Sequence, residues 1–264
     1  MRRVRPLPSY RGLAAAASIV LGLLIAACGG GGAPQRPTPP VVTATAESFG
    51  AIPLDRFHYV VTLTMREEAG KPGVVIVSTA GDFESPDRHA FTHNVRLGQT
   101  DLPRSAVIIG EEVWYRLGDL EWRETTLGDP DVSDLLADSF TTVRSDFLGG
   151  PAFAKVRESV RRLTPIQESA NGVAASHYQV SATGRAFFAA LLEQEELLRS
   201  LDDITWDLWL ADDGGWPVRL LVTATVPNGI PSLDLEGAVE WELRIDVSQP
   251  NDPALSVAPP AQGG

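Results

Sequence analysis

The chain has 264 residues, of which 34 are aspartate or glutamate and 22 are lysine or arginine, so its formal net charge is −12. Nucleic-acid phosphates and anionic lipid headgroups repel a surface of this charge, which excludes both as electrostatic partners. The single cysteine, Cys28, excludes a disulfide within the chain. The fold is therefore expected to depend on non-covalent packing alone.

The first 27 residues have the pattern of a signal peptide. Four arginines lie near the start, and an uncharged, alanine-rich stretch follows that is too short to span a bilayer comfortably. The pair Arg2-Arg3 suggests twin-arginine export, but Pro6 and Pro8 fit that signal badly, so general secretion is expected. Because residues 1–27 contain no acidic residue, their removal makes the formal net charge −16.

The junction at Cys28 resembles the lipobox of bacterial lipoproteins, since Ile25, Ala26 and Ala27 lead directly into the cysteine. The resemblance implies that Cys28 is diacylated on sulfur and becomes the mature N-terminus. Two acyl chains anchor stably, because each buried CH₂ contributes about 0.8 kcal/mol and one chain alone is marginal. We expect an extracytoplasmic protein anchored to the cell membrane, or to an outer membrane if the host has one. The alternative is an accidental cysteine in a cleaved peptide.

Composition divides the remaining chain into three parts. Residues 28–46 are rich in Gly, Pro and Thr and cannot bury enough apolar surface to fold, so they are expected to form a flexible tether. Residues 47–258 have the size of one domain. Residues 259–264 are expected to be a disordered tail.

Alternating apolar residues predict antiparallel strands in the first half of this domain. The expected strands cover residues 57–65, 74–83, 88–97, 104–110, 111–117 and 120–126. Turn residues separate them at 85–87, 110–111 and 118–119.

Helical spacing of apolar residues predicts three amphipathic helices in the middle of the chain. They are expected at 129–140, 151–163 and 183–201, with a strand pair near "TPIQES" and "ASHYQVSA" between the second and the third.

Strands return in the last third, where residues 204–226 contain a "DDGG" turn and residues 239–247 alternate strictly between apolar and charged side chains. We therefore predict an α+β fold. A large curved antiparallel sheet of eight to eleven strands would form an unclosed half-barrel, with about three helices covering its concave face.

Four stretches resemble, in order and spacing, the LppX/LprG-type lipoproteins of the LolA/LolB-like superfamily. They are "AGDFESPDR", "VIIGEEVWYRLGDLEWRE", "WDLWLADDGGWPVRLLVTAT" and "VSQPNDPALSVAPP", and the resemblance spans roughly residues 47 to 260. It implies a half-barrel with a hydrophobic cavity that holds the acyl chains of lipids or lipoproteins, and it implies no catalysis. The helical segments match no member of known ligand.

The expected function is therefore binding or transport of a lipid or acylated ligand, without a cofactor. Residues predicted to line the cavity are Phe57, Tyr59, Val61, Leu63, Phe187, Leu191, Trp206, Leu208, Leu220 and Trp241. Large aromatic residues on strand faces more often fill a core. The same fold with a filled core, serving as a tethered interaction or sensor domain, is the alternative.

Catalytic and metal sites have little support in the sequence. His89 and His93 are four residues apart, but a strand separates such residues by roughly 13 Å, so no zinc site is expected. The remaining histidines, His58 and His177, stand alone in the sequence. Neither Gly-x-Ser-x-Gly nor Ser-x-x-Lys occurs. The protein is not expected to be an enzyme, and an envelope hydrolase with dispersed catalytic residues is the third hypothesis.

Overall fold

The structure is a computed structural model, and it describes residues 53–67, 73–97, 100–129, 163–180, 202–229, 235 and 237–261. The expected signal peptide, the lipidation site Cys28, the whole of the tether and residues 262–264 of the tail lie outside these residues.

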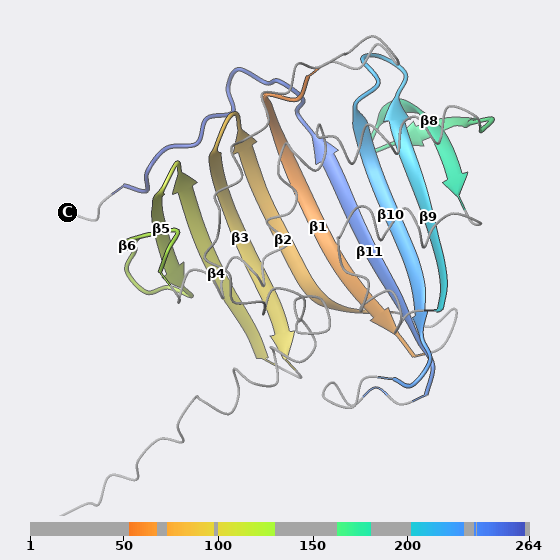
Figure 1. Cartoon of the computed structure of the whole chain (residues 1–264), viewed down its shortest axis with the longest axis horizontal. Helices are drawn as coiled ribbons and strands as arrows, with labels where there is room; N and C mark the ends of the chain where they lie inside the picture. The colour runs from red at the N-terminus through yellow and green to blue at the C-terminus, as the bar shows by residue number, and fades with distance from the viewer. Residues whose placement is uncertain are drawn as a thin grey trace, which may run out of the picture.

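The described residues form one antiparallel sheet of eleven strands (Figure 1). The strands are β1 (Arg56–Arg66), β2 (Val74–Glu84), β3 (Arg88–Leu97), β4 (Thr100–Ile109), β5 (Glu112–Leu117), β6 (Arg123–Thr126), β7 (Ile166–Ala170), β8 (Val173–Val180), β9 (Asp202–Ala211), β10 (Pro217–Val226) and β11 (Val239–Ser248). Their order is β6-β5-β4-β3-β2-β1-β11-β10-β9-β8-β7, so β6 and β7 are the two edges and the sheet is unclosed.

The first and last strands meet at the centre of the sheet. β1 pairs with β11 over nine residues, from His58 opposite Ser248 to Arg66 opposite Glu240. Every other neighbour pair joins strands that are consecutive in the chain. The described fold is therefore two meanders, β1–β6 and β7–β11, held together by the β1–β11 pairing, which Figure 1 shows as adjacent orange and blue arrows.

Period-two alternation decides which side chains are buried. In β11 the residues from Val239 to Val247 alternate between buried apolar side chains and half-buried ones that include Glu240, Glu242 and Asp246. β1 alternates in the same register, with Leu63 opposite Leu243. Because successive side chains of a strand point to opposite faces, the sheet has one apolar face and one outer, more polar face.

The hairpin turns form at the glycines of the predicted turns. Gly110 and Gly118 have positive φ values of 62° and 57°, between β4 and β5 and after β5. The "DDGG" turn joins β9 to β10, with φ values of 77° at Gly214 and 59° at Gly215. Glycine adopts this left-handed backbone without the steric penalty that a Cβ would bring.

After β11 the chain turns back along the sheet. The Asn251 side chain holds this turn against the start of β1 by two hydrogen bonds. Its oxygen accepts one from the Asp55 backbone amide at 2.8 Å, and its amide group donates one to the Pro53 carbonyl at 2.7 Å. Val257 then packs against Val107 and Trp114 on the outer face, and its amide donates to Glu84 at 3.0 Å. Figure 1 shows this C-terminal segment running toward the β5 end of the sheet.

The α+β prediction is wrong for the part of the chain that the structure describes. Those residues form strands, turns and loops and no helix, so the class observed there is β, with a single large unclosed antiparallel sheet. The helical prediction came from stripes of apolar residues at 129–140, 151–163 and 183–201, and these segments lie almost wholly outside the described residues. Within the described ranges, the period of two governs the structure. They contain no helix long and apolar enough to cross a membrane.

Candidate functional site

The apolar face of the sheet is the candidate ligand-binding feature, because it carries most of the larger of the two clusters of buried hydrophobic side chains among the described residues. It consists of the buried side chains on one side of eight neighbouring strands, which in sheet order are β5, β4, β3, β2, β1, β11, β10 and β9. At about 4.8 Å per strand, these strands span roughly 34 Å. The described residues form a single layer of strands, each packed on its neighbours in the sheet.

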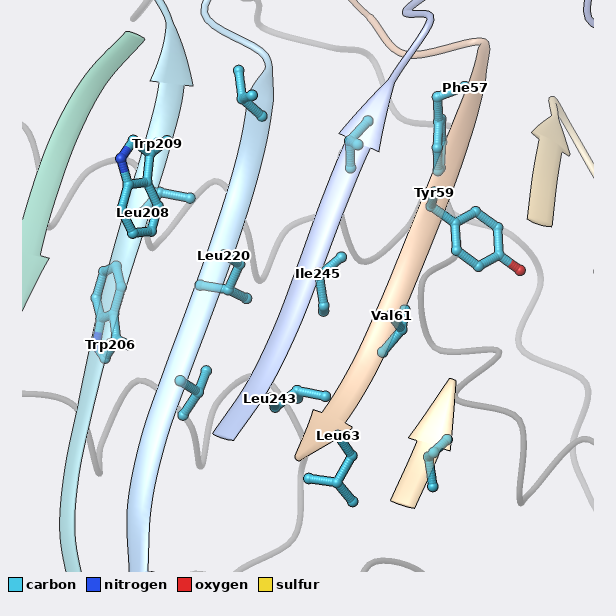
Figure 2. Close-up of a cluster of buried hydrophobic side chains, with 14 of the residues drawn as sticks. Phe57, Tyr59, Val61, Leu63, Trp206, Leu208, Trp209, Leu220, Leu243 and Ile245 are labelled. Atoms are coloured by element: carbon cyan, nitrogen blue, oxygen red, sulfur yellow. The ribbon is translucent and has the colours of Figure 1, made fainter. Parts of the chain in front are cut away.

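Eight of the ten predicted lining residues lie together on this face. Strand register places Tyr59, Val61 and Leu63 of β1 opposite Val247, Ile245 and Leu243 of β11. β10 and β9 continue the face, since Leu220 pairs with Ile245 on one side and with Leu208 on the other. Figure 2 shows these side chains on four neighbouring strands. The remaining members are Phe57, Trp206 and Trp241, which are buried on the same face, and Phe187 and Leu191, which lie outside the described residues.

These eight side chains are almost completely buried. Phe57, Val61, Leu63 and Leu208 are 0% exposed, and the other four are at most 3% exposed. No water-sized space therefore lies against the first four. An acyl chain on this face would have to replace protein atoms that now contact it.

A polar pair interrupts the apolar face at β2 and β3. Thr79 and His93 are both 0% exposed and lie opposite one another, with the Thr79 hydroxyl 2.9 Å from His93 Nδ1. The other ring nitrogen, Nε2, is buried and has no hydrogen-bond partner in the structure as far as the chain is described. Burial, followed by the positive charge of Arg104, lowers the pKa of His93 to about 4. The imidazole is therefore neutral near neutral pH.

Tyr59 brings a third polar atom close to this pair. Its ring extends from β1 on the side away from β11 (Figure 2) and passes over Gly81 of β2, where a Cβ would lie 2.8 Å from the tyrosine oxygen. Gly81 is opposite Phe91, which neighbours His93 along the same face of β3. Burial, followed by the negative charge of Asp82, raises the pKa of Tyr59. The phenol therefore stays protonated. We call Tyr59, Thr79 and His93 the polar island.

His89 and His93 lie too far apart to bind one metal ion together. Both lie on the apolar face of β3, where the strand keeps them roughly 13 Å apart. The described ranges hold no cluster of three or more His, Cys, Asp or Glu side chains that could bind a metal ion. His89 packs edge-on against Phe83, with ring centroids 4.8 Å apart.

His177 organises a different cluster on the outer face, near the β7 edge. Its Nδ1 lies 3.0 Å from Glu168 of β7, and its Nε2 lies 2.9 Å from Asp207 of β9. Its ring stacks on Trp209 with centroids 4.0 Å apart and planes 11° apart. The Trp209 indole N–H donates to Glu168. These contacts tie the edge strand to the body of the sheet.

Arg219 extends this outer-face cluster toward the centre of the sheet. Its guanidinium lies over the Trp209 ring, 5.5 Å from the ring centroid, and donates to Asp246 at 2.7 Å. Burial alone would raise the pKa of Asp246. Hydrogen bonds from Arg244, Arg219 and Asn171 outweigh it and lower that pKa. The described charges of the cluster are paired with one another, which is typical of a structural network.

Sequence reasoning missed the polar island, the outer-face cluster around His177, and the contact between His58 and Asp82. His58 and His177 stood alone in the sequence, yet His58 lies 2.7 Å from Asp82 and His177 contacts two carboxylates. Only knowledge of the strand register would have revealed these contacts, because they join directly opposed or diagonal residues on neighbouring strands. Trp206 and Trp209 lie on opposite faces of β9, because the register places Trp206 opposite Val222 and Trp209 opposite Arg219.

Comparison with known proteins leaves the family open. No protein-family model matches the sequence, and no curated protein matches it. Among solved structures, the chain is similar to a LolA superfamily protein from Nitrosomonas europaea, with 9% identity and a TM-score of 0.25, over 75% of this chain and 86% of that chain. A beta-barrel-like protein of unknown function from Brucella abortus has 10% identity and a TM-score of 0.19, over 75% and 100%. Likenesses this low assign this chain neither a fold nor a function.

Proposed function

We propose that this chain is a membrane-anchored extracytoplasmic lipoprotein that binds the acyl chains of a lipid against the apolar face and catalyses no reaction. The observation that carries the proposal is the extent of that face, eight strands wide on an unclosed sheet. Burial of hydrocarbon on such a surface is favourable by about 25 cal/mol per Å². The lipobox-like sequence before Cys28 supports the anchor.

The near-zero exposure of the eight lining side chains favours a second function. A face with no water-sized space against Phe57, Val61, Leu63 and Leu208 has the packing of a filled core. In that case the domain would be a tethered interaction or sensor module with no hydrocarbon ligand. The two functions differ in how the apolar face responds to added volume.

Two adjacent valines of β1 offer a matched test. Val61 points into the apolar face and is 0% exposed, whereas Val60 is half-buried on the outer face. If acyl chains replace the protein atoms that cover Val61, Val61→Trp should lower fatty-acid binding at least tenfold and destabilise the protein by less than about 1 kcal/mol. Val60→Trp should leave both unchanged. Binding is measured with a fluorescent fatty acid, and the free energy of unfolding with urea.

A filled core responds differently. Extra volume in a close-packed interior costs about 1–3 kcal/mol. Two results together would contradict lipid binding and establish the interaction module. They are a loss of stability in this range in Val61→Trp, and no uptake of fatty acid by the wild type.

A further inference from the structure

The buried Nε2 atom of His93 is a polar feature of the apolar face that the fold itself does not explain. Buried polar groups are hydrogen-bonded in the great majority of cases, and each exception needs a reason. The described residues supply a partner for Nδ1, the Thr79 hydroxyl at 2.9 Å, and none for Nε2. An apolar side chain of similar shape would fill the position without this cost.

The position of His93 relates it directly to the proposed ligand face. In register, Val61 of β1 lies opposite Thr79 of β2, which lies opposite His93 of β3. Two strand spacings place His93 about 10 Å from Val61. A hydrocarbon chain lying over Val61 and Ile245 could therefore carry a head group at its end to the polar island. The Tyr59 hydroxyl lies on the same side of β1, above Gly81.

We propose that the polar island binds the oxygen-bearing head of an amphiphile, with His93 Nε2 forming a hydrogen bond to a carboxyl or hydroxyl oxygen of the ligand. This inference rests on the proposed binding of acyl chains and adds the class of ligand: a single-chain fatty acid or alcohol is preferred over a hydrocarbon of equal length. The neutral imidazole has one donating and one accepting nitrogen. A hydroxyl or a protonated carboxyl can match either role at Nε2, and a carboxylate accepts from Nε2–H when the Thr79 hydroxyl donates to Nδ1.

The test compares three ligands with the same chain length: dodecanoic acid, 1-dodecanol and dodecane, each radiolabelled and measured by equilibrium dialysis. Wild-type protein should bind the acid or the alcohol at least tenfold more tightly than dodecane. Whichever of the two binds more tightly shows whether the polar island prefers a carboxyl or a hydroxyl head group. His93→Phe, which keeps a ring but removes both nitrogens, should bind all three alike, with its affinity for dodecane unchanged.

Two further variants separate recognition from structure. His89→Phe changes a histidine on the same face of the same strand and should keep the wild-type preference. His93→Gln keeps a polar group and should recover part of it. A loss of affinity for all three ligands in His93→Phe would show a purely structural role and overturn the inference.

The outcomes also separate this inference from the proposed function. Equal affinity of the wild type for all three ligands would leave acyl-chain binding intact and refute only head-group recognition. Failure of the wild type to bind any of them would refute both.

Discussion

Replacing Gly81 with alanine is expected to destabilise the protein by about 3 kcal/mol, because the added methyl group has no space. A Cβ at this position would lie 2.7 Å from the Ala90 carbonyl oxygen, 2.7 Å from the Phe91 Cβ and 2.8 Å from the Tyr59 hydroxyl oxygen. The first contact is with the backbone of the paired strand β3, which cannot move without breaking the β2–β3 ladder. Urea unfolding followed by tryptophan fluorescence measures the change.

Gly128 provides the matched control for this substitution. Its nearest neighbour, the Thr126 hydroxyl, would be 4.0 Å from an added Cβ, and the residue is exposed. Gly128→Ala should therefore leave stability unchanged or raise it by up to about 1 kcal/mol, as alanine does where the backbone is unstrained. If Gly81→Ala unfolds at the same urea concentration as the wild type, the close passage of the Tyr59 ring over β2 is wrong.

Replacing Trp206 with alanine is expected to cost about 3–5 kcal/mol. Among the described residues, Trp206 is the largest fully buried side chain, at 1% exposed, and it lies on β9 directly opposite Val222 of β10. Its removal takes away a large apolar area and leaves a cavity that the flanking Ile204 and Leu208 on the same strand face cannot fill. The free energy of unfolding, measured in urea or guanidinium, gives the size of the effect.

Trp122 is the comparison for Trp206, because it is a tryptophan on the periphery. It lies under the guanidinium of Arg116, 4.8 Å from the ring centroid, and is only partly buried. Trp122→Ala should cost no more than about 1 kcal/mol, the worth of such a cation–π contact at an accessible site. If both variants lost the same free energy of unfolding, burial of Trp206 in the apolar face would not be a larger source of stability than the peripheral contact of Trp122, which would contradict this account.

The strands of this fold were predictable because alternation is a local property of the chain. The residues of β11, from Val239 to Ser248, show which face is buried without knowledge of any neighbour. Boundaries were less predictable where turn-forming residues occur inside a strand. β4 begins at Thr100 and includes Pro103, which pairs with Asn94, whereas the alternating pattern begins at Arg104. Tertiary pairing extended the strand through residues of low intrinsic strand propensity.

The strand order and the polar island could not be read from the sequence. β1 pairs with β11, whose partner residues are about 180 positions away, and no local pattern encodes this choice. The same holds for His93, whose burial and contact with Thr79 depend on β2–β3 register. The helical part of the α+β prediction was inferred from the spacing of apolar residues at 129–140, 151–163 and 183–201, which lie almost wholly outside the described residues, and the described residues form a β structure.

The anchor and the ligand face are proposed to act together. A diacylated Cys28, joined to the domain by the tether, would hold the sheet within reach of the membrane surface. The acidic chain itself would not adhere to anionic headgroups, because they repel its net charge, which is −16 once residues 1–27 are removed. Lipid would then reach the apolar face through hydrophobic burial and not through charge attraction.

Native mass spectrometry of the full chain, extracted gently from the membrane of a bacterium that expresses it, tests the central claim most directly. Lipid binding predicts a population with added mass that matches one amphiphile, released by mild activation and reduced in Val61→Trp but not in Val60→Trp. A clean protein mass that carries only the modification at Cys28, together with no uptake of added fatty acid, would contradict lipid binding and leave the filled-core module.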